Sequence, residues 1–207
     1  MAAGTPQDGG EYFDLLLAES VRLHGHLCAG QVIGVRLSML GLRLLGITDP
    51  KGKDRKNLIV YVEIDRCATD AIQSVTGCSL GKRSLKWMDF GIMAATFVHL
   101  STKKAFRILA REDARELARN YCPEIEDKYR QQLEAYKRMR DDELFDIQEV
   151  RVNIPECDLP GRPLRRVICV RCGEHVQDCR DVEINGEVLC KACAGSRYYE
   201  VVSDTSV

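Results

Sequence analysis

Residues 58–72 read LIVYVEIDRCATDAI, an apolar run rich in β-branched residues that passes into a cysteine and a helical pattern. The first seven residues predict a buried strand, because short unbroken apolar runs of this kind are typical of strands inside a sheet. Residues 67–75 predict a short helix that ends at Gly77. Cys67 would then begin that helix, where the dipole and unpaired N–H groups are expected to lower the pKa of its thiol.

Helical and strand patterns continue on both sides of this stretch. Upstream, residues 11–23 and 29–45 predict two helices, separated by a break at Gly25. Downstream, the patterns predict strands at 84–88, 94–100, 105–109 and 145–154, and helices at 112–120 and 124–142. Strands and helices thus share one domain, which we expect to span residues 11–154.

The second predicted helix carries a stripe of small residues about one turn apart, namely Gly30, Gly34, Ser38 and Gly41. Glycine inside a helix costs roughly 1 kcal/mol relative to alanine. Several glycines on one helix therefore predict close backbone contact with another element, which could belong to a second subunit.

The C-terminal part of the chain has the sequence pattern of a small domain that a metal ion stabilises. Three prolines and a glycine in PECDLPGRP predict a linker at 155–164, and residues 165–200 are too few to bury an apolar core of their own. Cys169 and Cys172 form one C-x2-C pair, and Cys190 and Cys193 form another. Two such pairs can supply four thiolates to one tetrahedral zinc ion. We therefore predict a closed, structural zinc site. Asn185-Gly186 is expected to form the turn of a hairpin between the two pairs. His175 and Cys179 lie between the pairs and are not expected to take part in the site.

Composition narrows the class of protein and its location. The 207 residues are 45% hydrophobic and 29% charged with a net charge of −1, which gives no overall argument for binding nucleic acid or a membrane. A basic, apolar leader and a membrane-spanning run are both missing from the sequence, so we expect a cytoplasmic protein. In that compartment, ten cysteines indicate metal ligands or reactive thiols rather than disulfides.

A second group of candidate residues lies in the larger domain. The stretch HGHLCAG (24–30) holds His24, His26 and Cys28, although the chain has only four histidines. Cys67 and, in TGCSLGK (76–82), Cys78 also lie beside predicted element boundaries. These residues could share a metal ion, or one thiol could react while its neighbours tune it. The alternative is that each is structural, since a lone cysteine is commonly a small buried apolar residue.

The motifs HGHLCAG, VEIDRCATDAI, TGCSLGK and MDFG, followed by the paired C-x2-C tail, resemble the FmdE family over about residues 12–150. That family is named for a formylmethanofuran dehydrogenase gene that lies beside molybdenum enzyme genes. One departure is Ala29, where the family usually has proline. The resemblance implies an α+β fold with a mixed β-sheet flanked by helices, a thioredoxin-like core that forms a homodimer, and a C-terminal zinc finger in some members.

The resemblance also implies a core site built from His24, His26, Cys28, Cys67 and Cys78. Asp70 would reach back to the first-turn N–H groups of its helix, and Lys82 would lie near Cys78. In a catalytic version of this site, Cys67 would supply the thiolate and His24 the base, with Asp70 and Lys82 as neighbours. The ligand types suit zinc, nickel or iron.

Three functions remain open at this stage, and the sequence does not decide whether the protein is an enzyme. The first is a metal-binding, thiol-containing accessory or redox protein that works with molybdenum or tungsten enzyme subunits. The second is a regulator with a metal-sensing core, whose zinc finger contacts nucleic acid or RNA polymerase through the basic run RPLRR (162–166). Acidic residues in the same tail argue against nucleic-acid binding, because they would repel phosphate groups. The third is a metallochaperone with an exchangeable core ion.

Overall fold

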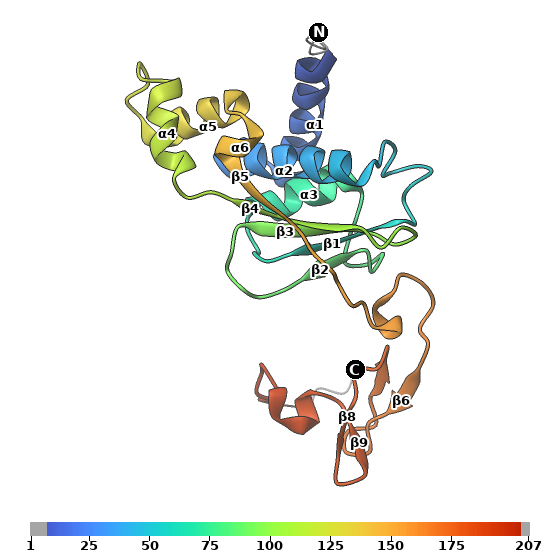
Figure 1. The fold of residues 1–207 in the computed structure, drawn as a ribbon. Coiled ribbons are helices and arrows are strands. Elements are labelled where there is room, and N and C mark those ends of the chain that lie inside the picture. Colours follow the sequence, from blue (N-terminus) through green and yellow to red (C-terminus); the bar gives the residue numbers. More distant parts are fainter. Residues whose placement is uncertain (1–7, 204–207) are drawn as a thin grey trace. The chain divides into compact units, whose positions relative to one another are not determined.

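The structure is a computed structural model that describes residues 8–203 (Figure 1). The chain divides into two compact units, the first ending at Asn153 and the second beginning at Ile154. No helix among residues 8–203 is long and apolar enough to cross a membrane.

The first unit is built on a mixed five-stranded sheet in the order β2-β1-β3-β4-β5. β1 runs parallel to the edge strand β2 and antiparallel to the central strand β3, and the sheet continues through antiparallel β4 and β5. The strands are β1 (Leu58–Val62), β2 (Leu85–Trp87), β3 (Ala94–His99), β4 (Ala105–Ala110) and β5 (Phe145–Glu149). This mixed sheet with its helices confirms the predicted α+β class.

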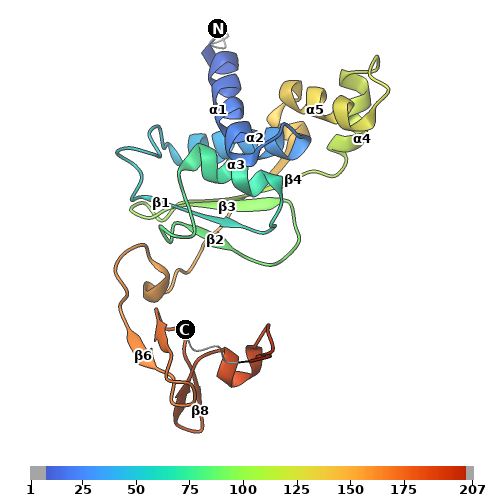
Figure 2. The same ribbon diagram turned by 180° about the vertical axis from the view of Figure 1, so that it is seen from behind.

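Residues 8–153 form six helices: α1 (Asp8–His24), α2 (Ala29–Leu45), α3 (Cys67–Thr76), α4 (Ala114–Tyr121), α5 (Lys128–Arg138) and α6 (Asp141–Leu144). Figures 1 and 2 show α1, α2 and α3 together on one face of the sheet. Cross-strand partners share a face, so Val60 and Phe97 both point from the sheet into the same buried cluster. The core therefore lies between the sheet and these helices.

The small-residue stripe of α2 is used inside the chain. A Cβ at Gly34 would lie 2.5 Å from the Ala68 carbonyl oxygen of α3, and one at Gly41 would lie 2.5 Å from the Phe97 ring of β3. The hydroxyl of Ser38 donates to the Gly34 carbonyl of its own helix. The predicted close contact thus exists, and its partners are α3 and β3.

The predicted helix over 124–142 is two helices, because a distant side chain ends the first one. Asp127 caps the start of α5 by accepting the Arg130 N–H at 2.8 Å. At the other end, the Arg36 guanidinium of α2 donates to the carbonyls of Tyr136 and Met139, both at 2.8 Å. Carbonyls at a helix end need partners from outside the helix. The last strand also differs from its prediction, because β5 stops at Glu149 rather than at residue 154.

The second unit contains two small antiparallel sheets, formed by β6 (Arg166–Ile168) with β7 (His175–Gln177) and by β8 (Val182–Ile184) with β9 (Glu187–Leu189). Asn185 and Gly186 both have positive φ, 52° and 81°, as a two-residue hairpin turn of this kind requires. Two short helical turns, η1 (Glu156–Asp158) and η2 (Ala192–Ser196), complete the unit.

Cys179 has a structural role in this unit, contrary to the prediction, because it forms a disulfide with Cys157. The prediction that the cysteines serve only as ligands or thiols is therefore wrong for this pair. Asp178 and Cys179 both have positive φ, so the chain turns sharply there. A cross-link suits a unit with a small apolar core. Among residues 154–203, the buried members of its cluster are Cys169, Leu189 and Cys190.

Candidate metal centres

Three helix ends carry the candidate residues of the first unit. His24 is the last residue of α1, which Gly25 ends with a φ of +96°. Cys28 is the extended N-cap of α2 (φ −146°), and Cys67 is the first residue of α3. Each of these three residues therefore lies at a helix boundary.

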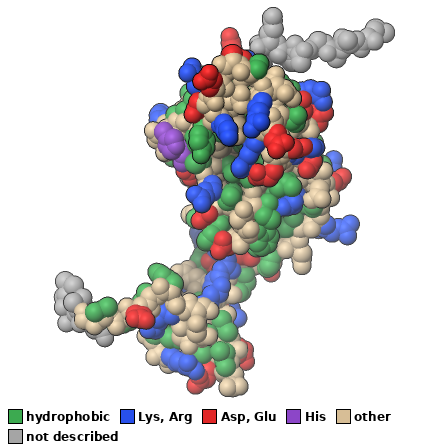
Figure 3. Space-filling view, turned by 90° about the vertical axis from the view of Figure 1, so that its left-hand side faces the viewer, with side chains coloured by type: hydrophobic (Ala, Val, Ile, Leu, Met, Phe, Trp, Pro, Cys, Tyr) green, Lys and Arg blue, Asp and Glu red, His purple; other side chains and the backbone are tan. Residues whose placement is uncertain are grey.

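The structure brings four of these side chains together. His24, His26 and Cys28 each offer a ligand atom, and these atoms lie within 4.8 Å of one another. The imidazole ring centroids are 4.5 Å apart, and Figure 3 shows histidine side chains at the surface of the first unit. Cys67 lies next to this group of three, because the backbone at Gly30 comes close to both the Cys67 Cβ and the Cys28 Sγ. We call these four residues the core centre.

The absence of a side chain at Gly30 allows Cys67 to approach. A Cβ at Gly30 would lie 2.9 Å from Cys67 Cβ and 3.7 Å from Cys28 Sγ. Carbon atoms in contact are normally about 3.5–4.0 Å apart. Any larger residue would therefore push the first turns of α2 and α3 apart, and the two thiols with them.

Asp70 orients His24 instead of capping its own helix. Its Oδ2 lies 2.7 Å from His24 Nδ1. Arg66 is the N-cap of α3 and has no side-chain capping bond, and Asp70 is the fourth residue of the helix. The other ring nitrogen of His24, Nε2, is buried and has no hydrogen-bond partner among the residues that the structure describes. A histidine with one nitrogen held by a carboxylate and the other unpaired has the arrangement of a metal ligand.

The thiol of Cys67 differs from the expected activated nucleophile. Its pKa is raised, first because burial disfavours the thiolate, and then because of the hydrogen bond and charge of Cys28 and the negative charge of Asp70. A backbone hydrogen bond lowers the pKa by less. The helix N-terminus alone does not make this thiol acidic.

The second unit brings its four paired cysteines together. The sulfur atoms of Cys169, Cys172, Cys190 and Cys193 lie within 4.8 Å of one another and could hold a metal ion. The Cys193 N–H donates to Cys190 Sγ at 3.3 Å. The pKa of Cys169 is lowered to about 6, first because the backbone of Cys190 hydrogen-bonds to its sulfur. We call this group the tail centre.

A family model described as "FmdE, Molybdenum formylmethanofuran dehydrogenase operon" matches residues 23–151, which is more than half of the chain. The chain belongs to the FmdE family. The resemblance seen in the sequence motifs is thereby confirmed. The matched range includes the whole core centre, whereas the tail centre of this FmdE-family chain lies beyond it.

Two similar proteins extend the comparison. A "Probable S-adenosyl-L-methionine-binding protein" of Archaeoglobus fulgidus is 29% identical over 207 residues, covering 90% of this chain. The match covers 54% of that protein, so the FmdE-family chain spans about half the length of this curated relative. A solved "tungsten formylmethanofuran dehydrogenase subunit e (fmde)-like protein" from Syntrophus aciditrophicus has a similar fold. Its TM-score is 0.60 at 19% identity, over 91% of this chain and 95% of that one.

Cys78 and Lys82 do not join the core centre of this FmdE-family chain. They follow the C-terminus of α3, and the ten residues of that helix put about 15 Å between its ends. Cys78 is buried with its Sγ 3.8 Å from the Leu58 carbonyl, and burial raises the pKa of its thiol. The Lys82 ammonium donates to the Gly77 carbonyl at 2.9 Å. Both residues therefore have local structural partners.

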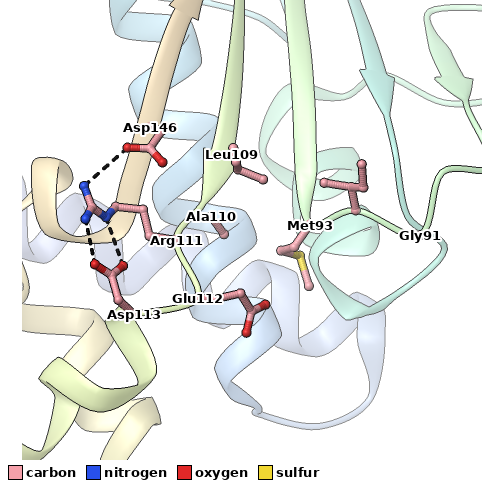
Figure 4. A pocket seen from close by; sticks show the side chains of 9 residues that line it. Gly91, Met93, Leu109, Ala110, Arg111, Glu112, Asp113 and Asp146 are labelled. Atoms are coloured by element: carbon pink, nitrogen blue, oxygen red, sulfur yellow. Dashed lines mark hydrogen bonds and ion pairs between the residues drawn. The ribbon is translucent and has the colours of Figure 1, made fainter.

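A cavity of about 480 Å³ lies beside the sheet and was not predicted from the sequence (Figure 4). Apolar residues, three acidic side chains and one arginine line it: Gly91, Ile92, Met93, Leu109, Ala110, Arg111, Glu112, Asp113 and Asp146. Asp113 and Asp146 hold the Arg111 guanidinium at 2.6 and 3.3 Å, so its charge is neutralised. The cavity lies at the same end of the sheet as Cys67, because the Ile92 N–H donates to the carbonyl of Glu63, four residues before Cys67. The acidic run after the strand at 105–109 is the sequence signal that could have indicated it.

Proposed function

We propose that the chain is a metal-binding accessory protein of molybdenum or tungsten formylmethanofuran dehydrogenase metabolism, with a metal ion at the core centre and a structural zinc ion at the tail centre. This proposal rests mainly on the buried Nε2 of His24, which has no hydrogen-bond partner within residues 8–203. Asp70 orients this imidazole beside His26 and Cys28. A buried polar atom without a partner costs roughly 1–3 kcal/mol, so a ligand at that atom is expected.

The donor sets of the two centres suit different roles. Two imidazoles and two thiols can hold zinc, nickel or iron, and an ion held there would supply Lewis acidity. Four thiolates around zinc leave no position for a substrate, which supports a structural role for the tail centre. Asp70 would fix the tautomer of His24, whatever the ion.

We also propose that the protein acts in the cytoplasm as a homodimer, alongside molybdenum or tungsten enzyme subunits. Family membership supports this setting. The glycines of α2 no longer argue for a dimer, because their contacts lie within the chain.

The nucleic-acid alternative has less support, because arginines of the second unit are paired with carboxylates. Arg165 lies 2.8 Å from Asp181, and Arg180 lies 2.6 Å from Asp158. Charges committed to such pairs are less available to phosphates.

Elemental analysis of anaerobically purified protein tests the proposal. Wild type should hold two metal ions per chain, and His24→Ala and Cys67→Ala should each hold one. His99→Ala is the matched control, because His99 ends β3 and belongs to neither centre. A single zinc ion in all four proteins would show that only the tail binds metal and would reject the core centre.

A second candidate function is binding of a sulfonium ligand such as S-adenosylmethionine in the cavity. Its lining has three acidic groups against one basic group over an apolar floor, which favours an organic cation. The name of the Archaeoglobus fulgidus relative points to the same ligand. Calorimetry should detect binding of S-adenosylmethionine. Binding should be weaker for S-adenosylhomocysteine, which lacks the sulfonium charge, and S-adenosylmethionine should also bind more weakly to Glu112→Gln. Equal binding of both ligands, or none, would reject this candidate.

A further inference from the structure

Gln31, in the first turn of α2, is a fully buried amide that contacts all three helices of the core centre. Its Oε1 accepts the hydroxyl of Ser20 on α1. Its Nε2 donates to the carbonyl of Cys67 on α3 at 2.5 Å. Its backbone N–H donates to the carbonyl of Cys28 at 3.0 Å. One residue therefore holds the backbone of both cysteines in the core centre.

The orientation of this amide is determined by its partners. The Cys67 carbonyl can only accept, so the NH2 group of Gln31 must face it. The oxygen of the amide then points to Ser20, whose hydroxyl donates to it. Ser20 is itself fully buried, so water does not compete for either bond. The amide is thus fixed in one orientation.

We propose that Gln31 is a positioning residue of the core centre, which sets the separation of the Cys28 and Cys67 thiols, with Ser20 as its support. The inference rests on the proposed function, because the centre is taken to bind metal. Gly30 brings the first turns of α2 and α3 into contact, and the adjacent Gln31 bonds them together. Loss of that bond would let the two thiols move independently.

The consequence should appear in metal affinity. Residues that orient metal ligands typically change affinity by about 10–100-fold when replaced. Gln31→Met keeps a similar length and removes both side-chain hydrogen bonds. We expect it to release the core ion at roughly tenfold lower chelator concentration, or less, than wild type. Ser20→Ala should cause a smaller change in the same direction, and it provides a second test where Gln31→Met folds poorly.

The chain offers a matched control in Gln131. This buried glutamine of α5 donates its Nε2 to the carbonyls of Cys122 and Ile125 at 2.9 and 3.0 Å. Gln131→Met therefore removes the same chemistry from a place outside the core centre. Both methionine variants should lose stability, and only Gln31→Met should lose core metal affinity.

The experiment titrates the zinc-loaded full chain with a chelator and measures retained zinc. The His24→Ala variant supplies the curve of the tail centre alone. The absorption spectrum of cobalt added to the core should also change in Gln31→Met and not in Gln131→Met, which a loss of stability alone would not produce. Identical zinc curves and cobalt spectra for the two methionine variants would overturn the role of Gln31. A wild type that holds zinc only in its tail would instead reject the proposed function, and this inference with it.

Discussion

Gly34→Ala tests the packing that places α2 against α3. The added Cβ would lie 2.5 Å from the Ala68 carbonyl oxygen, 2.6 Å from Ala71 Cβ and 2.8 Å from Ala68 Cα. Two of these atoms are backbone of a helix and cannot rotate away. Carbon contacts are normally about 3.5–4.0 Å, so the two helices must separate by roughly 1 Å.

Two opposing contributions set the magnitude for Gly34→Ala. Overpacking a core typically costs about 1–3 kcal/mol, and rigid backbone obstacles place this site at the upper end. Alanine is better than glycine inside a helix by roughly 1 kcal/mol, which offsets part of the cost. We expect a net loss of about 2 kcal/mol in the free energy of unfolding of the first unit.

Urea unfolding followed by tryptophan fluorescence measures this loss. Trp87 is the single tryptophan of the chain and lies on β2, so its signal reports on the first unit. Gly10→Ala is the control, because a Cβ there meets no atom of the described residues within 4 Å. The substitution should leave stability unchanged or raise it by up to about 1 kcal/mol. If Gly34→Ala unfolds at the same urea concentration as wild type or higher, the close contact between α2 and α3 is refuted.

Three further predictions use other parts of the chain. Arg107→Ala removes two hydrogen bonds of 2.7 Å that the guanidinium donates to the buried Glu63 carboxylate. It should lower the free energy of unfolding by about 3 kcal/mol in the same urea assay. The loss should be smaller in the double variant with Glu63→Leu, which leaves no unpaired charge. A loss below about 1 kcal/mol in the single variant would contradict the pairing. Burial raises the pKa of Asp141, but hydrogen bonds from two arginines of α2 outweigh it and hold the pKa below its usual value. The folded pKa is thus below the unfolded one, so this stabilisation is complete above about pH 4 and is lost as pH falls through the folded value. Unfolding measured against pH should show that loss in wild type and not in Asp141→Asn. Cys190→Ser should release the ion of the tail centre and make the second unit sensitive to proteolysis, while the Trp87 fluorescence of the first unit stays unchanged. If the variant resists protease as well as wild type does, the ion is not structural.

The elements that could be predicted well from the sequence are those whose ends are marked locally. Gly25 and Gly77 end helices through positive φ, and both ends were predicted from the glycines alone. The end of α5 was missed because Arg36, about 100 residues away in the sequence, bonds its last carbonyls. Such a tertiary contact leaves no mark in the segment that it ends.

The same distinction applies to the site. His24, His26 and Cys28 are close in sequence, so their proximity in space could be expected. Cys67 could be recognised as a candidate residue because the sequence predicts that a strand ends just before it and a helix begins with it. Cys78 has equally suggestive glycine neighbours, but the length of α3 puts it at the far end. The Cys157–Cys179 disulfide was missed because its cysteines lie in no recognisable spacing pattern.

The electrostatics of the core centre bear on the two interpretations that the sequence left open, a metal ligand set and a reactive thiol. Cys28 is the N-cap of α2 and Cys67 is the first residue of α3, and the N-terminal dipoles of these helices favour negative charge there. Burial and the neighbouring Cys28 and Asp70 nevertheless raise the pKa of Cys67, which makes it a poor nucleophile near neutral pH. A bound cation reverses that balance, because it pairs with the thiolates and deprotonates them. The residues that disfavour a lone thiolate at Cys67 are therefore the residues that favour a cation beside it, and a metal centre accounts for the arrangement better than a free reactive thiol.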